Sequence, residues 1–155
     1  MKLSGVLKAM DNKMTEETEN KNKLRKVGII SCGGEDLPEG SISRLAALDV
    51  LLRRKPFDTT TICLPLYIAG GEGDRLFAKN YPTITVDGCE KLCAKKATEK
   101  FSSKVTSSIN VKDFIKEGEK LTNRRNLNDK EKEIAQRVAD QIEKDVDKIL
   151  SEGQD

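Results

Sequence analysis

The chain has 155 residues, of which 28 are Lys or Arg and 26 are Asp or Glu, so its formal net charge at pH 7 is only +2. A charge this small provides no strong field for nucleic acid or for an anionic membrane surface, and we expect neither as a partner. The chain has no histidine, which excludes Ser-His and Cys-His nucleophile pairs as well as catalytic zinc held by histidine.

Residues 1–24 are predicted to form a short amphipathic helix and a polar linker. Apolar residues recur there at helical spacing, at Leu3, Val6, Leu7 and Met10. Polar residues interrupt the apolar stretch that a signal peptide needs, and no later stretch approaches the roughly 20 apolar residues of a membrane span. We therefore expect a cytoplasmic protein, whose cysteines stay reduced and act as metal ligands or reactive thiols.

The segment KVGIIS, residues 26–31, is rich in β-branched residues and predicts a buried strand that ends at Ser31. The loop CGGEDLPEG follows, with glycines and a proline that favour turns. Ser41 is then expected to cap a helix that runs to about Arg54. This strand and helix form the first half of a β-α-β unit.

The pattern repeats along the chain. Residues 59–64 (TTTICL) and 83–87 (TITVD) predict two further strands, with a short helix in GDRLFAKN between them. Gly88 should turn the chain into a helix that carries Cys89 and Cys93, and a weaker fourth strand is expected within residues 104–111. Alternation of this kind predicts an α/β fold, a small open and mainly parallel sheet of about four strands flanked by helices.

The last predicted element is a long amphipathic helix within residues 119–155. Asn128 or Asp129 is expected to cap it, Glu131 to complete a capping box and Gly153 to end it. Its apolar stripe consists of Ile134, Val138, Ile142, Val146 and Leu150. We expect this helix to dock on the cysteine-containing domain, residues 25–118; a homodimer contact is the alternative use of the stripe.

Three of the four cysteines follow predicted strands. Cys32 comes after the first strand, Cys63 lies at the end of the second and Cys89 follows the third. Parallel strands end at one edge of the sheet, where open α/β sheets bind ligands, so these thiols are expected to converge there. Cys93, one turn beyond Cys89 on the same predicted helix face, would complete a cluster of four.

A cluster of thiolates needs a cation between its negative sulfurs. Zinc binds four sulfurs at about 2.3 Å, and four cysteines suit zinc or an iron-sulfur centre better than magnesium or calcium. Helix N-termini that follow the strands add partial positive charge, which favours thiolate over thiol. We therefore predict a metal site made of Cys32, Cys63, Cys89 and Cys93, with zinc as its metal and an iron-sulfur cluster as the alternative.

Two other interpretations of the cysteines stay open. Each cysteine taken singly is also typical of a buried apolar position. In a redox or sulfur-transfer enzyme, Cys89 would be the nucleophile and one of the other thiols would resolve it, although the chain lacks a C-x-x-C motif. The loops contain neither G-K-[ST] nor C-x5-R, so a nucleotide-binding or phosphatase loop is not expected.

The segments IISCGG (29–34), ICLPLYIAG (62–70) and ITVDGCEKLCAKKATEK (84–100) resemble a family of zinc-binding proteins named for a D-G-C motif, here Asp87, Gly88 and Cys89. The resemblance covers about residues 27–111. It implies zinc bound by four chelating cysteines, which correspond to Cys32, Cys63, Cys89 and Cys93, and it implies no particular physiological role; metal handling or sensing is the role that we expect. Gly88 is expected to supply the turn and Asp87 to cap the next helix.

Overall fold

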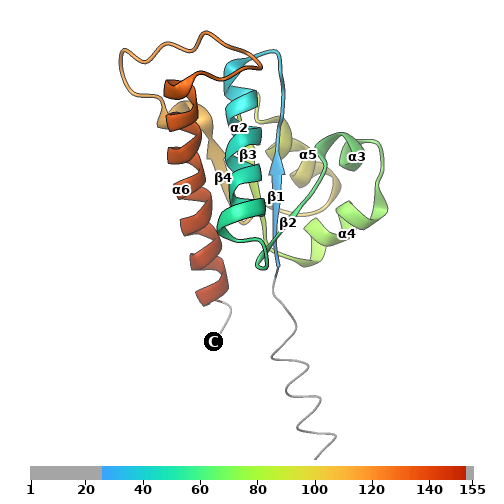
Figure 1. Ribbon diagram of the computed structural model, residues 1–155. Helices are drawn as coiled ribbons and strands as arrows, with labels where there is room; N and C mark the ends of the chain where they lie inside the picture. The colour runs from blue at the N-terminus through green and yellow to red at the C-terminus, as the bar shows by residue number, and fades with distance from the viewer. Residues whose placement is uncertain (1–25, 153–155) are drawn as a thin grey trace, which may run out of the picture.

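The computed structural model describes residues 26–152 (Figure 1). The predicted N-terminal helix and linker, residues 1–24, and the predicted helix end at Gly153 lie outside the described residues. The elements, in chain order, are β1 (Val27–Ser31), α2 (Pro38–Asp49), the π-helical turn η1 (Val50–Arg54), β2 (Thr59–Thr61), α3 (Leu64–Ile68), α4 (Glu72–Asn80), β3 (Thr83–Asp87), α5 (Cys93–Phe101), β4 (Ser107–Asn110), the 3-10 turn η2 (Val111–Phe114) and α6 (Asp129–Glu152).

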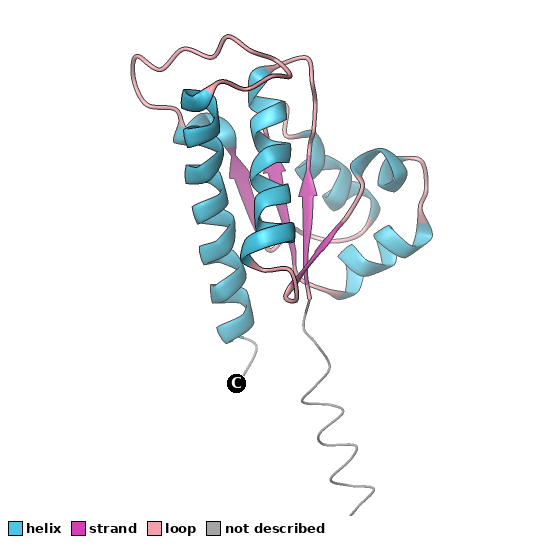
Figure 2. Ribbon diagram, viewed as in Figure 1, coloured by secondary structure: helices cyan, strands magenta, loops and turns pink. Residues whose placement is uncertain are grey.

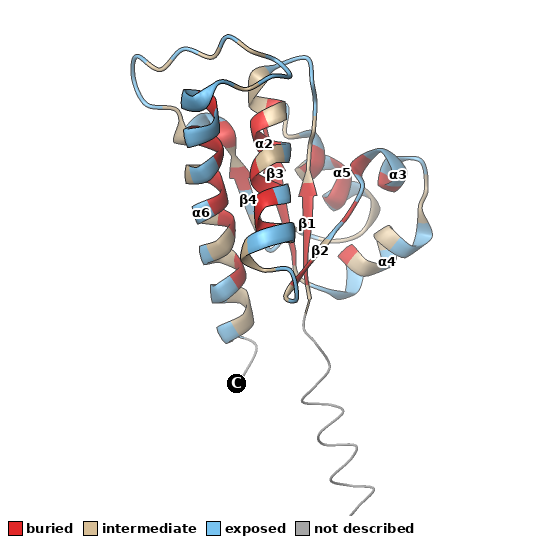
Figure 3. Cartoon of the chain, in the orientation of Figure 1, coloured by how far each residue is buried: buried red, intermediate tan, exposed pale blue. Residues whose placement is uncertain are grey.

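The four strands form one parallel sheet in the order β2-β1-β3-β4. All four arrows therefore point the same way in Figure 2, and the predicted α/β class is confirmed. Side chains alternate along β1, so Ile29 packs with α2 and α6 on one face, while Ile30 packs with α3, α4 and α5 on the other. The sheet is the middle of three layers, and both its faces are buried (Figure 3).

The helix α2 begins three residues before the predicted cap, so the assignment of Ser41 as N-cap is wrong. Leu37 is the N-cap, with extended backbone, and Pro38 begins the helix. Proline is favoured at the first helical position because its φ is already helical and its missing N–H needs no partner there. Ser41 instead lies in the first turn and donates its hydroxyl to the carbonyl oxygen of Arg124.

The second strand is shorter than predicted. It ends at Thr61, and Leu64 already begins α3, with Pro65 in the first turn. A short apolar run has no periodicity that separates strand from helix, and the proline that was expected only to end the strand also favours the start of a helix. Cys63 therefore occupies the N-cap position of α3 and is not a strand residue.

The long C-terminal helix α6 has the predicted capping box. The backbone N–H of Glu131 donates to Asn128 Oδ1 at 2.9 Å, and the N–H of Asn128 donates to Glu131 Oε2 at 2.8 Å. The apolar stripe of α6 belongs to the core cluster that α2 and the sheet also form, with Leu150 only partly buried at its end. Among residues 26–152, no helix combines the length and the apolar character that crossing a bilayer requires.

Glu131 also holds the loop that leads into α6. Its side chain is fully buried, and its Oε1 accepts the backbone N–H groups of Thr122 at 2.7 Å and Asn123 at 3.0 Å. Burial raises the pKa of this carboxyl, but the hydrogen bonds from Asn123, Thr122 and Asn128 outweigh it, so the pKa is lowered from its ordinary 4.5. The ionised carboxylate therefore stabilises both the loop and the helix start.

Replacing Glu131 with Gln should lower the free energy of unfolding at pH 7 by about 1–3 kcal/mol, because an amide NH2 would then face buried N–H donors. The carboxylate contributes fully above its unfolded-state pKa of about 4.5, and this contribution is lost as the pH falls through the lowered folded-state pKa. Urea unfolding at several pH values measures the difference, with the exposed Glu133→Gln as control. A difference independent of pH would contradict this role.

Candidate functional site

Three cysteines lie at neighbouring positions along the carboxyl edge of the sheet. The strand order β2-β1-β3 means that Cys63, Cys32 and Cys89, which follow those strands, come at neighbouring positions along the edge. Cys93 is the first residue of α5, which leaves the same edge. The edge is the upper end of the sheet in Figure 1, where the loops after the strands and the loop before α6 gather.

Cys32 has the most defined surroundings of the four. Its Sγ accepts the backbone N–H of Gly88 at 3.2 Å and lies 3.4 Å from the Oγ of Ser43. Ser43 is fully buried and donates its hydroxyl to the carbonyl oxygen of Gly40 at 2.7 Å. Because that hydrogen is already used, the thiol of Cys32 is the donor to Ser43, and its sulfur is the acceptor for Gly88.

The contact between Cys32 and Gly88 depends on close backbone packing. A Cβ on Gly88 would lie 2.7 Å from the backbone nitrogen of Gly40 and 2.8 Å from the carbonyl carbon of Glu39. A Cβ on Gly40 would in turn lie 1.8 Å from the carbonyl oxygen of Gly34. The chain after β1, the start of α2 and the chain after β3 therefore touch through backbone atoms, which only glycine allows.

Asp87 is the predicted cap of the next helix. Its two carboxylate oxygens accept the backbone N–H groups of Ala94 at 2.8 Å and Lys95 at 3.1 Å. Burial raises the pKa of Asp87 from its ordinary 3.8, although these two hydrogen bonds oppose the shift. Asp87 and Gly88 thus have structural roles: one anchors α5, and the other allows the close contact beside Cys32.

The predicted position of Cys89 on a helix face shared with Cys93 is wrong. Cys89 lies in a turn, closed by the N–H of Leu92 donating to the carbonyl oxygen of Cys89 at 3.1 Å, and α5 begins only at Cys93. Leu92 has φ 51° and ψ 50°, and within residues 26–152 it is the sole non-glycine residue with positive φ. Such a left-handed conformation costs a leucine roughly 1–2 kcal/mol, so packing must hold this turn in place.

A cation that the sequence analysis missed lies beside Cys89. Lys112 forms a salt bridge with Glu90, which raises the pKa of the lysine, and interactions with Glu39 and Cys89 add to the shift. Lys112 follows β4, so the rule that located the cysteines at the ends of the strands would also have located this residue. Ser43 gave no comparable signal, because its role depends on how α2 packs against β1.

The four thiols share an edge without being grouped around one point. Cys63 and Cys93 are exposed, whereas Cys32 and Cys89 are partly buried. Across residues 26–152, no three His, Cys, Asp or Glu side chains are arranged so that they could hold a metal ion. The donor set has the chemistry that zinc prefers, but this arrangement is not that of a closed four-sulfur site.

Comparison with known protein families gives one match. A family model described as DGC domain matches residues 28–149, which is more than half of the chain. The match continues beyond the resemblance seen in the sequence, through the loop before α6 and most of α6 itself. Neither a curated protein nor a solved structure matches the chain.

Replacing Gly88 with Ala should lower the free energy of unfolding by about 1–3 kcal/mol, because the added methyl group meets backbone atoms that have no space to move. Gly73→Ala is the matched control: a Cβ there meets nothing within 4 Å, and the position lies inside α4. This second variant should gain roughly 0.5–1 kcal/mol from helix propensity. Equal stabilities of the two variants in urea unfolding would refute the close contact.

Proposed function

The chain belongs to the DGC domain family, and from that premise we propose that it binds zinc through Cys32, Cys63, Cys89 and Cys93 and serves in metal handling or sensing. The observation that carries the proposal is the strand order, since three neighbouring strands each end beside a cysteine. Thiolates are the ligands that zinc and other soft metals prefer. An iron-sulfur centre would use the same four residues and is the alternative metal group.

The exposure of the thiols bears on what kind of metal site this would be. Cys63 is the N-cap of the short helix α3 and Cys93 is the first residue of α5, and both side chains are exposed. Cys32 is tied to Gly88 by a hydrogen bond and has less freedom. Closure around a metal would therefore require movement mainly of Cys63 and Cys93. A site that opens in this way suits a metal that is taken up and released better than a permanent structural zinc.

The start of α5 favours this closure electrostatically. Cys93 is the first residue of the nine-residue helix α5, where unpaired backbone N–H groups give partial positive charge. Part of that charge is already matched by Asp87, which accepts two N–H groups of α5. Lys112 adds a full positive charge near Cys89, offset by its salt bridge to Glu90. Both positive charges lie near sulfurs that must be ionised in order to bind a metal.

Protein purified anaerobically without chelator should contain close to one zinc per chain, and its thiols should react only after the metal is removed. Replacing Cys89 or Cys93 with Ser should lower the metal content at least about tenfold at limiting free zinc, since each removes one thiolate ligand. Plasma mass spectrometry and a thiol titration on the same sample measure both quantities.

Glu99→Gln is the matched control for the metal measurement, because it removes an exposed carboxylate from α5 and leaves every thiol in place. Its zinc content should equal that of the unchanged protein. Full zinc content in the Cys89→Ser, Cys93→Ser double variant would refute the assignment of the ligands. Iron with acid-labile sulfide in place of zinc would select the iron-sulfur alternative.

A second candidate function is thiol chemistry, and one observation favours it. The sulfur of Cys32 accepts an N–H from Gly88, a donor that would also serve a thiolate once the proton now donated to Ser43 has left. This changes the expected nucleophile from Cys89 to Cys32. In disulfide reduction, the Cys32 thiolate would attack a substrate disulfide and expel one thiol; a second cysteine would then attack Cys32, form an internal disulfide and release the other thiol.

Alkylation rates distinguish the two candidate functions. In metal-free variants that keep a single cysteine, thiol chemistry predicts that Cys32 reacts with iodoacetamide several-fold faster than Cys63 at pH 7, although Cys63 is the more exposed. Mass spectrometry of the carbamidomethylated chain gives both rates. If the rates simply follow exposure, with Cys63 reacting faster, the role of Cys32 as a nucleophile is excluded.

A further inference from the structure

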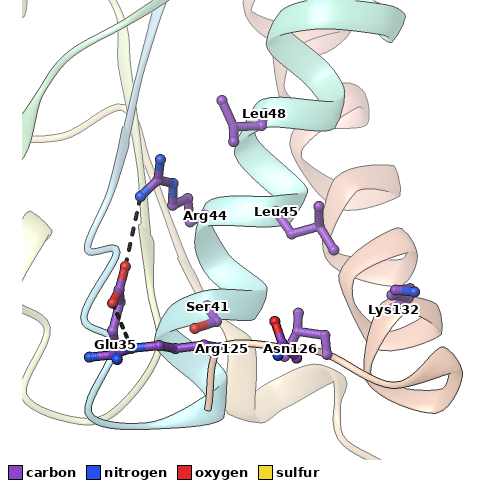
Figure 4. A pocket seen from close by; sticks show the side chains of 9 residues that line it. Glu35, Ser41, Arg44, Leu45, Leu48, Arg125, Asn126 and Lys132 are labelled. Atoms are coloured by element: carbon purple, nitrogen blue, oxygen red, sulfur yellow. Dashed lines mark hydrogen bonds and ion pairs between the residues drawn. The ribbon is translucent and has the colours of Figure 1, made fainter. Parts of the chain in front are cut away.

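A pocket of about 550 Å³ lies next to the cysteine edge, between α2 and the chain segment that leads into α6 (Figure 4). Leu45 and Leu48 of α2 and Leu127 of the incoming segment form its apolar surface. Leu48 is 37% exposed, more than is usual for a leucine that packs inside a domain. The volume is in the range of sites for small molecules.

The polar part of the same pocket is mainly cationic. Arg44, Arg125 and Lys132 contribute three positive charges, and Glu35 contributes the single negative one. Figure 4 shows Glu35 between the two guanidinium groups, with Arg125 Nε at 3.0 Å and Arg44 NH1 at 4.0 Å from its carboxylate oxygens. One carboxylate is therefore shared by two arginines, and the pocket retains a net positive charge.

We propose that this pocket binds a small amphipathic anion, an oxyanion head group on an aliphatic chain. Arginine guanidinium groups bind carboxylates and phosphates through paired N–H donors, so Arg44 and Arg125 would bind the head group. The three leucines would cover the aliphatic chain, and the lining includes no aromatic ring that would favour a flat ligand. Lys132 lies across the pocket on α6, where a salt bridge to Asp129 at 3.7 Å offsets part of its attraction for an anion.

Glu35 is the competing anion in this arrangement. An incoming head group would take over the Arg125 N–H that Glu35 now accepts and would compete with Glu35 for the charge of Arg44, so the negative charge of Glu35 weakens binding. Removing that charge should strengthen binding, whereas removing the arginines should weaken it. Opposite effects from two side chains in contact would not follow from general damage to the fold.

Isothermal titration calorimetry with decanoate, decyl phosphate, decanol and inorganic phosphate tests the proposal. Decanoate or decyl phosphate should bind at least about tenfold more tightly than decanol, which lacks the charge, and than inorganic phosphate, which lacks the aliphatic chain. The stronger of the two binders identifies the head group as carboxylate or phosphate. No detectable binding of either anion at millimolar concentration would overturn the proposal.

Three variants complete the test, each first checked for an unchanged thermal unfolding curve. The double variant Arg44→Ala, Arg125→Ala should bind the anion at least about tenfold more weakly. The variant Glu35→Gln should bind it more tightly. Lys79→Ala removes an exposed cation from α4, on the other face of the sheet, and should leave binding unchanged. Equal affinity in all variants would overturn the proposal. Zinc-free and zinc-loaded protein should bind the anion alike, since no pocket residue is a proposed metal ligand.

Discussion

Two glycines at the carboxyl edge, Gly40 and Gly88, allow three backbone segments to touch, and the position of Cys32 depends on that contact. Gly40 lies against the backbone of Gly34 after β1, and Gly88 after β3 lies against the backbone at the start of α2. The same approach lets the N–H of Gly88 reach the sulfur of Cys32. A side chain at Gly40 or Gly88 would separate these segments, and the edge that carries the thiols would no longer hold its shape.

Much of this edge was predictable because parallel strands all end at the same edge of a sheet. The ends of β1 at Ser31 and of β3 at Asp87 followed from short β-branched runs bounded by turn residues, and the capping box of α6 followed from Asn128 and Glu131. The start of α5 could not be predicted, because it depends on Leu92 adopting a left-handed conformation that leucine rarely takes. Tertiary contacts, which no local pattern reports, must hold that turn.

The sequence therefore predicted the edge of the sheet at which the four thiols lie, but not the local backbone structure that separates them. Cys89 and Cys93 are separated by a turn instead of sharing a helix face, and Cys63 caps a helix instead of ending a strand. Partly buried Cys32 and Cys89 lie toward the sheet, and exposed Cys63 and Cys93 lie outside. Binding of a metal would require Cys63 and Cys93 to move inward, which fits reversible binding. Thiol chemistry at Cys32 would require no such movement.

X-ray absorption at the zinc edge, on protein loaded with one equivalent of the metal, tests most directly whether the four cysteines form the metal site. If they do, zinc should have four sulfur neighbours at about 2.3 Å, the distance of a tetrahedral zinc thiolate site. Loss of one sulfur in each single Cys→Ser variant would assign the ligands to Cys32, Cys63, Cys89 and Cys93. A shell made mainly of oxygen or nitrogen, unchanged in those variants, would contradict a metal site formed by these thiols.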